Sequence, residues 1–146
     1  MATDGLKNPH LATHPHGYFA DPETMLPTRG PVVTATWCRD GSRDMILTKP
    51  VVSVDPKGRE HRAPVGFRTN GLSAWRVCWR LVSPFEPLSR EASVIHDWLC
   101  WIGWDWNDAA WVFYHAMRAN GIGPVRAWIR WAAVRFIGKR FQGRHR

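Results

Sequence analysis

The chain has 146 residues, ten tryptophans, three cysteines and a formal net charge of +8. This length predicts one ordinary domain, able to bury roughly two-thirds of the surface of its unfolded chain. The odd cysteine number and the absence of a C-x-x-C pair argue against a disulfide framework and a zinc knuckle, so we expect a reduced, intracellular place of synthesis.

Residues 1–30 are rich in proline and show no hydrophobic periodicity, which predicts an extended N-terminal arm. Three histidines lie in this arm, His10, His14 and His16, but nothing around them sets a metal-ligand spacing. No positively charged n-region precedes an apolar h-region, so we expect no secretory signal. No window reaches the roughly 18 uninterrupted apolar residues of a membrane span, and no transmembrane segment is expected.

Residues 31–67 have the pattern of short strands. The β-branched run VVTATW at 32–37 is followed by an Asp-Gly turn, which is a hairpin signal. Further strands are predicted at MILT (45–48), VVSV (51–54) and HRAPVGF (61–67), and Pro50 indicates an edge or a bend. Together these segments predict a small antiparallel β-meander.

Three helices are predicted in the second half of the chain, each with a capping or first-turn signal. They are a helix capped by Ser89 that runs to about residue 101, one capped by Asp105 or Asn107 that ends at 120–121, and one from Pro124 to about 138. The predicted fold class is α+β, a small antiparallel β-meander followed by three packed α-helices. Residues 31–138 would form this single domain, between the arm and a basic C-terminal tail at 139–146.

The dipeptide His96-Asp97 stands in an apolar, tryptophan-rich segment of the first predicted helix. We expect His96 to face the helix of residues 108–119. Adjacent helical residues point about 100° apart, so His96 and Asp97 are not expected to form a simple His-Asp relay.

Three interpretations of this dipeptide stay open. His96 could be a general base with Asp97 or Asp108 orienting a water or a cation, and the same three residues could ligate a metal. Alternatively, both residues are buried polar anchors, with Asp97 paired to Arg76 or Arg90. The chemistry alone favours the anchors, because a His-Asp dipeptide is not specific to catalysis and a single histidine makes a poor metal site.

Four segments resemble a known family: RAPVGFRTNGLSAWR, SREASVIHDWLCW, VFYHAMRANGI and WIRWAAVRFIG. In this order and spacing they are similar to the phage-borne family called domain of unknown function 1353, over about residues 30–138. The resemblance implies a gene of bacteriophage or prophage origin, often near structural or lysis genes. The turn at 67–76 then supplies the candidate binding residues Thr69, Asn70, Ser73 and Arg76.

Two positions depart from the family pattern. Asn70 stands where the family has an aspartate, and Ala110 replaces a second aspartate, which leaves Asp108 as the nearest carboxylate. The helix pair is also similar to that of secreted phospholipases A2, but their Gly-rich calcium loop and their disulfides are missing. These departures favour a structural or binding role over hydrolysis.

The net positive charge resides in residues 109–146. All 12 acidic residues and 12 of the 20 basic residues lie at or before Asp108, so the remaining eight basic residues carry the whole net charge. The predicted basic patch consists of Arg126, Arg130, Arg135, Lys139, Arg140, Arg144 and Arg146. An electrostatic field of one sign favours phosphate, anionic lipid or an acidic protein surface as the binding partner. No motif predicts sequence-specific recognition of DNA.

The third predicted helix carries an apolar stripe at helical spacing. The stripe consists of Val125, Trp128, Ile129, Ala132, Ala133 and Phe136. We expect it to close the core over the first two helices. Outside a domain, the same segment would be typical of an interfacial amphipathic helix.

The leading hypothesis is a phage-encoded accessory protein, associated with the virion in the tail or head-tail region, that binds other phage structural proteins. The first alternative is a small hydrolase of lipid esters or cell-wall bonds with the catalytic residues His96, Asp97 and Asp108. Such a hydrolase could use a divalent cation, and no other cofactor or metal is predicted. The second alternative is binding to a membrane surface through residues 124–141. The expected locations are the host cytoplasm during synthesis and then the virion.

Overall fold

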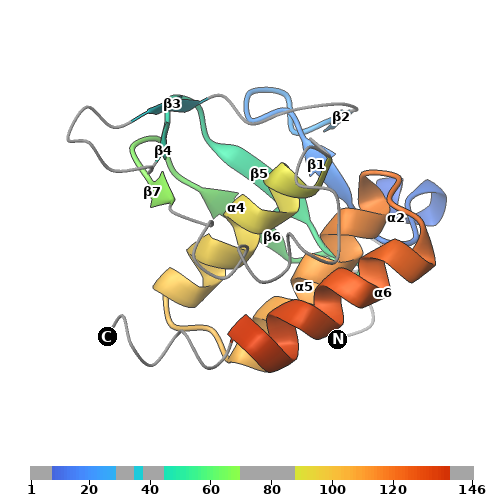
Figure 1. Ribbon diagram of the computed structural model, residues 1–146. Coiled ribbons are helices and arrows are strands. Elements are labelled where there is room, and N and C mark those ends of the chain that lie inside the picture. The colour runs from blue at the N-terminus through green and yellow to red at the C-terminus, as the bar shows by residue number, and fades with distance from the viewer. Residues whose placement is uncertain (1–7, 29–34, 38–44, 70–87, 139–146) are drawn as a thin grey trace.

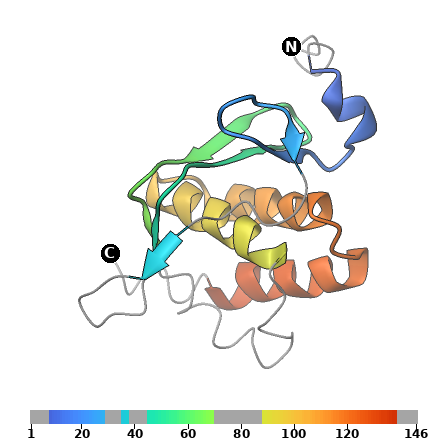
Figure 2. The same cartoon turned by 90° about the horizontal axis from the view of Figure 1, so that it is seen from above.

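A computed structural model describes residues 8–28, 35–37, 45–69 and 88–138 (Figure 1). It confirms the α+β class, with antiparallel strands followed by helices. The helices are α2 (His10–Thr13), α4 (Leu88–Trp101), α5 (Trp106–Ala119) and α6 (Pro124–Ala133), which continues as the π-helix η1 (Val134–Gly138). Figure 2 shows the strand layer packed on α4 and α5, with α6 on the far side of these helices.

The strands belong to two antiparallel sheets. The larger sheet has the order β2-β1-β5-β6 and consists of β1 (Tyr18–Ala20), β2 (Pro27–Thr28), β5 (Val51–Val54) and β6 (Glu60–Ala63). The smaller sheet has the order β3-β4-β7 and consists of β3 (Ala35–Trp37), β4 (Met45–Leu47) and β7 (Arg68–Thr69). The strands at 35–37, 45–47, 51–54 and 60–63 lie within or beside the predicted segments, but they do not follow one another in a single meander.

Residues 18–28 contribute strands to the larger sheet, although the sequence predicted an extended arm there. β1 pairs with β5, with Tyr18 opposite Val54 and Ala20 opposite Val52. β1 is only three residues long, which is too short for an alternating pattern to stand out in the sequence. Its strand conformation therefore depends on pairing with a distant segment of the chain.

The larger sheet is covered on both faces. Phe19 and Val51 face the helices and join the main core with side chains of α4 and α5. Tyr18, Val52 and Val54 face the other way and form a small cluster under Leu11 and Met25. Because side chains alternate along a strand, this arrangement requires apolar residues at successive positions, as the VVSV run provides.

The helices begin and end close to the predicted residues. Asp105 caps α5, since its carboxylate accepts hydrogen bonds from the backbone N–H groups of Asn107 and Asp108. Pro124 occupies the first turn of α6, where its missing N–H is not needed. Gly121, with φ at +87°, makes the turn between α5 and α6.

Candidate functional site

His96 lies on α4 at the interface with α5 and is almost fully buried. Its ring stands edge-on to Trp106, with centroids 5.0 Å apart, and lies 5.4 Å from the ring of Phe113. Cys100, one turn further along α4, places its Sγ 3.8 Å from Nε2 of His96. The expectation that His96 faces the following helix is confirmed, and its surroundings there are aromatic.

The Asp97 carboxylate lies at the limit of ion-pair range from His96. Nδ1 of His96 is 3.9 Å from Oδ1 of Asp97, which is longer than a hydrogen bond. Burial acts to lower the pKa of His96, but the Asp97 carboxylate and the Cys100 side chain raise it to about 9. A histidine that is protonated at neutral pH suits an anchor, because a general base must be able to accept a proton.

Of the other predicted catalytic and binding residues, only Asp97, Asp108 and Thr69 fall within the described part of the chain. Asp108 is exposed in the first turn of α5, and within the described residues no hydrogen bond or ion pair joins it to His96. Thr69 ends β7, while Asn70, Ser73 and Arg76 lie outside the described residues. The described part of the chain also contains no cluster of three or more His, Cys, Asp or Glu side chains that could hold a metal ion.

A second histidine–aspartate pair, which the sequence analysis did not single out, lies at the turn between β5 and β6. Asp55 is buried and accepts hydrogen bonds from Nε2 of His61 and Nε of Arg59, each at 2.8 Å. Its other oxygen accepts the backbone N–H groups of Lys57 and Arg59. Burial acts to raise the pKa of Asp55, but the hydrogen bonds from His61 and Arg59 outweigh it and hold that pKa below its ordinary value.

The same turn is fastened to the helical layer by two tryptophans. The Arg59 guanidinium lies 5.0 Å from the ring of Trp104, and the Lys57 ammonium lies 4.9 Å from the ring of Trp111. His61 stands edge-on to Trp104 at 5.0 Å. The pair of Asp55 and His61 therefore joins the sheet to the helices. The sequence signal for this pair was the aspartate at the start of the DPKGRE turn.

The three histidines of the predicted arm do not form a shared site. His10 and His14 contact the ring of Tyr18, whereas Nδ1 of His16 lies 3.0 Å from Nδ1 of His115 on α5. Burial lowers the pKa of His16, and burial, His16 and Arg118 lower that of His115 to about 4. Both rings are therefore neutral at neutral pH, and one Nδ1 can donate to the other.

The apolar stripe predicted on the third helix is turned mainly to solvent, so the expectation that it closes the core was wrong. Val125, Trp128 and Phe136 are 70%, 58% and 65% exposed. The buried residues of α6 are Ala127, Arg130 and Ala133. Small alanines let α6 approach α5 closely. Trp131 packs partly against the core, whereas Val125, Trp128 and Phe136 lie on the solvent side. Val125, Trp128 and Phe136 are called the α6 face below.

The residues of the predicted basic patch are divided by the fold. Arg126 is exposed, and Arg135 is partly buried with its guanidinium 5.1 Å from the ring of Trp131. Arg130 is only 1% exposed and is therefore not part of the surface patch. Lys139, Arg140, Arg144 and Arg146 lie outside the described residues. Within the described ranges, no helix has the length and apolar character needed to cross a membrane.

The fold and these clusters define a small α+β protein with an anchored histidine inside its helical layer and an exposed apolar helix face. The chain belongs to the family described as "Protein of unknown function (DUF1353)", whose model matches residues 45–134, from β4 to the start of η1. The family resemblance drawn from the sequence is thereby confirmed.

One relative is the "Uncharacterized protein y4jT" of Sinorhizobium fredii (strain NBRC 101917 / NGR234), which is 36% identical over 86 residues. The aligned residues are 58% of this chain and 26% of that protein, so the chain spans about a quarter of the relative's length. No solved structure matches the chain.

Proposed function

We propose that the protein is an accessory binding protein that attaches to a larger structure through the α6 face. The bacteriophage origin and the virion association expected from the sequence are part of this proposal. In it, His96 anchors α4 against α5 and takes no part in chemistry.

The observation that carries the proposal is the exposure of the α6 face. Three large apolar side chains of one helix segment stand in solvent, although the same segment buries alanines and an arginine. Exposing Trp128 and Phe136 is unfavourable unless another surface covers them, and contiguous apolar patches mark interaction sites in soluble proteins. Tryptophan and arginine are also the residue types that dominate the energetics of binding surfaces.

The alternative of a hydrolase centred on His96 has weaker support. His96 is buried among Trp106, Phe113 and Cys100, and its raised pKa favours the protonated form. Within the described part of the chain, no hydrogen bond or ion pair joins the exposed Asp108 to His96. A water-activating site needs a neutral base within hydrogen-bond reach of an accessible substrate.

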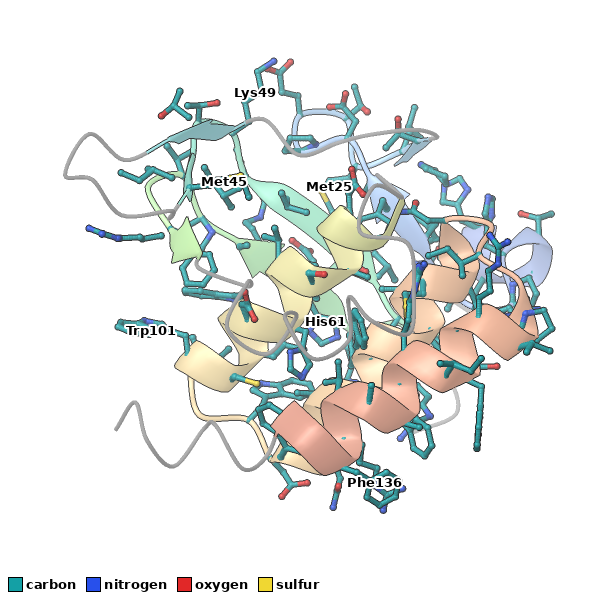
Figure 3. The ribbon with its side chains drawn as sticks, viewed as in Figure 1. Met25, Met45, Lys49, His61, Trp101 and Phe136 are labelled. Atoms are coloured by element: carbon teal, nitrogen blue, oxygen red, sulfur yellow. The ribbon has the colours of Figure 1, made fainter. Side chains whose placement is uncertain are left out.

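Fractionation of producing cells and of purified virions tests the proposal. The wild-type protein should sediment with a particulate fraction, whether virions or envelope. The double variant Trp128→Ala/Phe136→Ala should remain soluble while keeping a normal fold, because both side chains are exposed. Trp101→Ala is the matched control, since Trp101 is an exposed tryptophan on α4 and lies away from Phe136 (Figure 3). Equal sedimentation of wild type and double variant would contradict the proposal.

A further inference from the structure

The α6 face has the spacing of one helix side. Val125, Trp128 and Phe136 follow one another at intervals of three and eight residues, and Ile129 and Ala132 lie between them, partly buried. Figure 2 shows α6 as the outermost element on its side of the described residues. The free side of this helix is therefore an apolar strip that a flat surface can cover along its whole length.

Among the described residues, the charged side chains of the helical segment 124–138 are all arginines. Arg126 is exposed one residue after Val125, and Arg135 lies with its guanidinium 5.4 Å from the ring of Phe136. In the sequence, four further basic residues follow at 139–146, and no acidic residue occurs after Asp108. Aromatic residues on one side of a helix with Lys and Arg at its flanks are typical of helices that lie in the interface of a membrane.

We infer that the α6 face docks on an anionic lipid surface, with α6 lying in the plane of the headgroups, an inference that rests on the proposed function. Trp128 and Phe136 would enter the boundary between headgroups and acyl chains, where aromatic rings are favoured. Arg126 and Arg135 would contact lipid phosphates. A protein partner would need apolar pockets for the aromatic side chains and acidic groups on both flanks. An anionic membrane offers an apolar interior and negatively charged headgroups over its whole surface.

Co-sedimentation with vesicles tests this inference on the full chain. The probes are vesicles of phosphatidylglycerol mixed with phosphatidylcholine, and vesicles of phosphatidylcholine alone. Binding should be at least ~10-fold tighter to the mixed vesicles at low salt and should weaken as salt is added. Equal binding to both vesicle types, or no binding to the anionic ones, would overturn the inference.

Variants separate the apolar and the charged contributions. Trp128→Ala/Phe136→Ala should weaken binding by ~10-fold or more, because two aromatic side chains leave the lipid. Arg126→Gln should weaken it about fivefold on anionic vesicles and leave binding to phosphatidylcholine unchanged. Trp101→Ala and Lys49→Gln are the controls, since both residues are exposed and Figure 3 shows them away from Phe136. A loss in Trp101→Ala as large as that in the double variant would overturn the assignment to α6.

Brominated lipids give a second readout. Because the chain has ten tryptophans, the quenching of total fluorescence is not specific, but the difference between wild type and Trp128→Phe reports on Trp128 alone. We expect brominated anionic lipid to quench wild type more than Trp128→Phe, with equal unfolding midpoints for the two proteins. Equal quenching would show that Trp128 stays outside the lipid and would contradict the inference.

The result also distinguishes this inference from the proposed function. If the double variant is lost from purified virions while no variant and no salt change affects vesicle binding, the α6 face binds a protein and the lipid inference fails. If the double variant behaves as wild type with both virions and vesicles, the attachment role of the α6 face fails as well.

Discussion

Two histidine–aspartate pairs in the described part of the chain differ in almost every respect. His61 and Asp55 are six residues apart in the sequence, face each other across the β5–β6 turn, and share a hydrogen bond of 2.8 Å. His96 and Asp97 are neighbours on α4, yet Nδ1 of His96 and Oδ1 of Asp97 are 3.9 Å apart. The tight pair holds a turn against the helices, and the loose one lies on α4, in the interface with α5.

This difference follows from backbone geometry. Successive residues of a helix point about 100° apart, so neighbours cannot place their functional groups face to face. A hairpin, in contrast, brings residues several positions apart to the same point and directs their side chains toward one face. Proximity in the sequence is therefore a poor guide to which ionisable groups interact.

Breaking the pair of Asp55 and His61 by substitution of Asp55 should have the largest effect on stability. Asp55→Ala leaves the buried His61, the Arg59 guanidinium and two backbone N–H groups without their acceptor. We expect the free energy of unfolding to fall by about 3 kcal/mol, since a buried charged acceptor is lost. Urea denaturation measures this value.

The exposed ion pair of Glu60 and Arg62 supplies the control for Asp55→Ala. Its Nε and Oε1 atoms are 3.3 Å apart and both side chains are more than 40% exposed, so Glu60→Gln should cost less than ~0.5 kcal/mol. If the two variants differ by less than ~1 kcal/mol, the description of Asp55 as an anchor is wrong.

The sequence predicted the local elements of the fold better than their partners. Caps and turn residues act over a few positions, which is why α4, α5, α6 and the strands at 45–47 and 51–54 appear close to their predicted bounds. β1 was missed because its pairing with β5 is a long-range contact. The division of the strands between two sheets could not be predicted for the same reason.

The orientation of α6 could not be predicted from residue size. Trp128 and Phe136 look like core residues, but the interior instead accepts Ala127, Ala133 and the long side chain of Arg130. A prediction from hydrophobic periodicity assigns the buried face of a helix mainly by its large apolar residues. Close packing of two helices, in contrast, favours small residues at the contact. At the candidate site, the placement of His96 against α5 was predicted, and the pairing of Asp55 with His61 was not.

His96→Ala should have the next largest effect. The substitution removes a buried ring from between Trp106 and Phe113 and leaves a cavity in the helical layer. We expect the free energy of unfolding to fall by ~2 kcal/mol, measured by urea denaturation, with no change in esterase or muralytic assays. A His96→Ala protein of wild-type stability that has lost a measurable hydrolytic activity by ~100-fold would overturn the anchor role.

The two pairs should also respond to pH at opposite ends of the scale. The pKa of His96 is raised to about 9 from its ordinary 6.5, so the protonated ring stabilises the fold below pH 6.5 and this contribution is lost as the pH rises through 9. The pKa of Asp55 is lowered from 3.8, so its contribution is present above pH 3.8 and is lost in more acidic solution.

Unfolding of wild type and of His96→Gln between pH 6.5 and 9 measures the first of these contributions. We expect wild type to lose about 1 kcal/mol relative to the variant across this interval, a reduced value because Asp97 is partly exposed and solvent screens it. The partly buried pair of His16 and His115 has lowered pKa values and so titrates on the acidic side of this window. Parallel pH profiles for the two proteins would show that His96 does not carry the raised pKa.

The smallest expected effect is the coupling within the loose pair itself. A double-mutant cycle with His96→Ala and Asp97→Asn removes the contributions that each residue makes to other neighbours, including those of Asp97 outside the pair. Across 3.9 Å, with the carboxylate partly exposed, we expect a coupling energy of ~0.5 kcal/mol. The same cycle with Asp55→Asn and His61→Ala should give ~2 kcal/mol, because that pair is buried and shares a hydrogen bond of 2.8 Å. A coupling in the loose pair equal to that in the tight pair would mean that the two helical neighbours act as a unit in solution, and the catalytic interpretation of His96 would then regain its strongest argument.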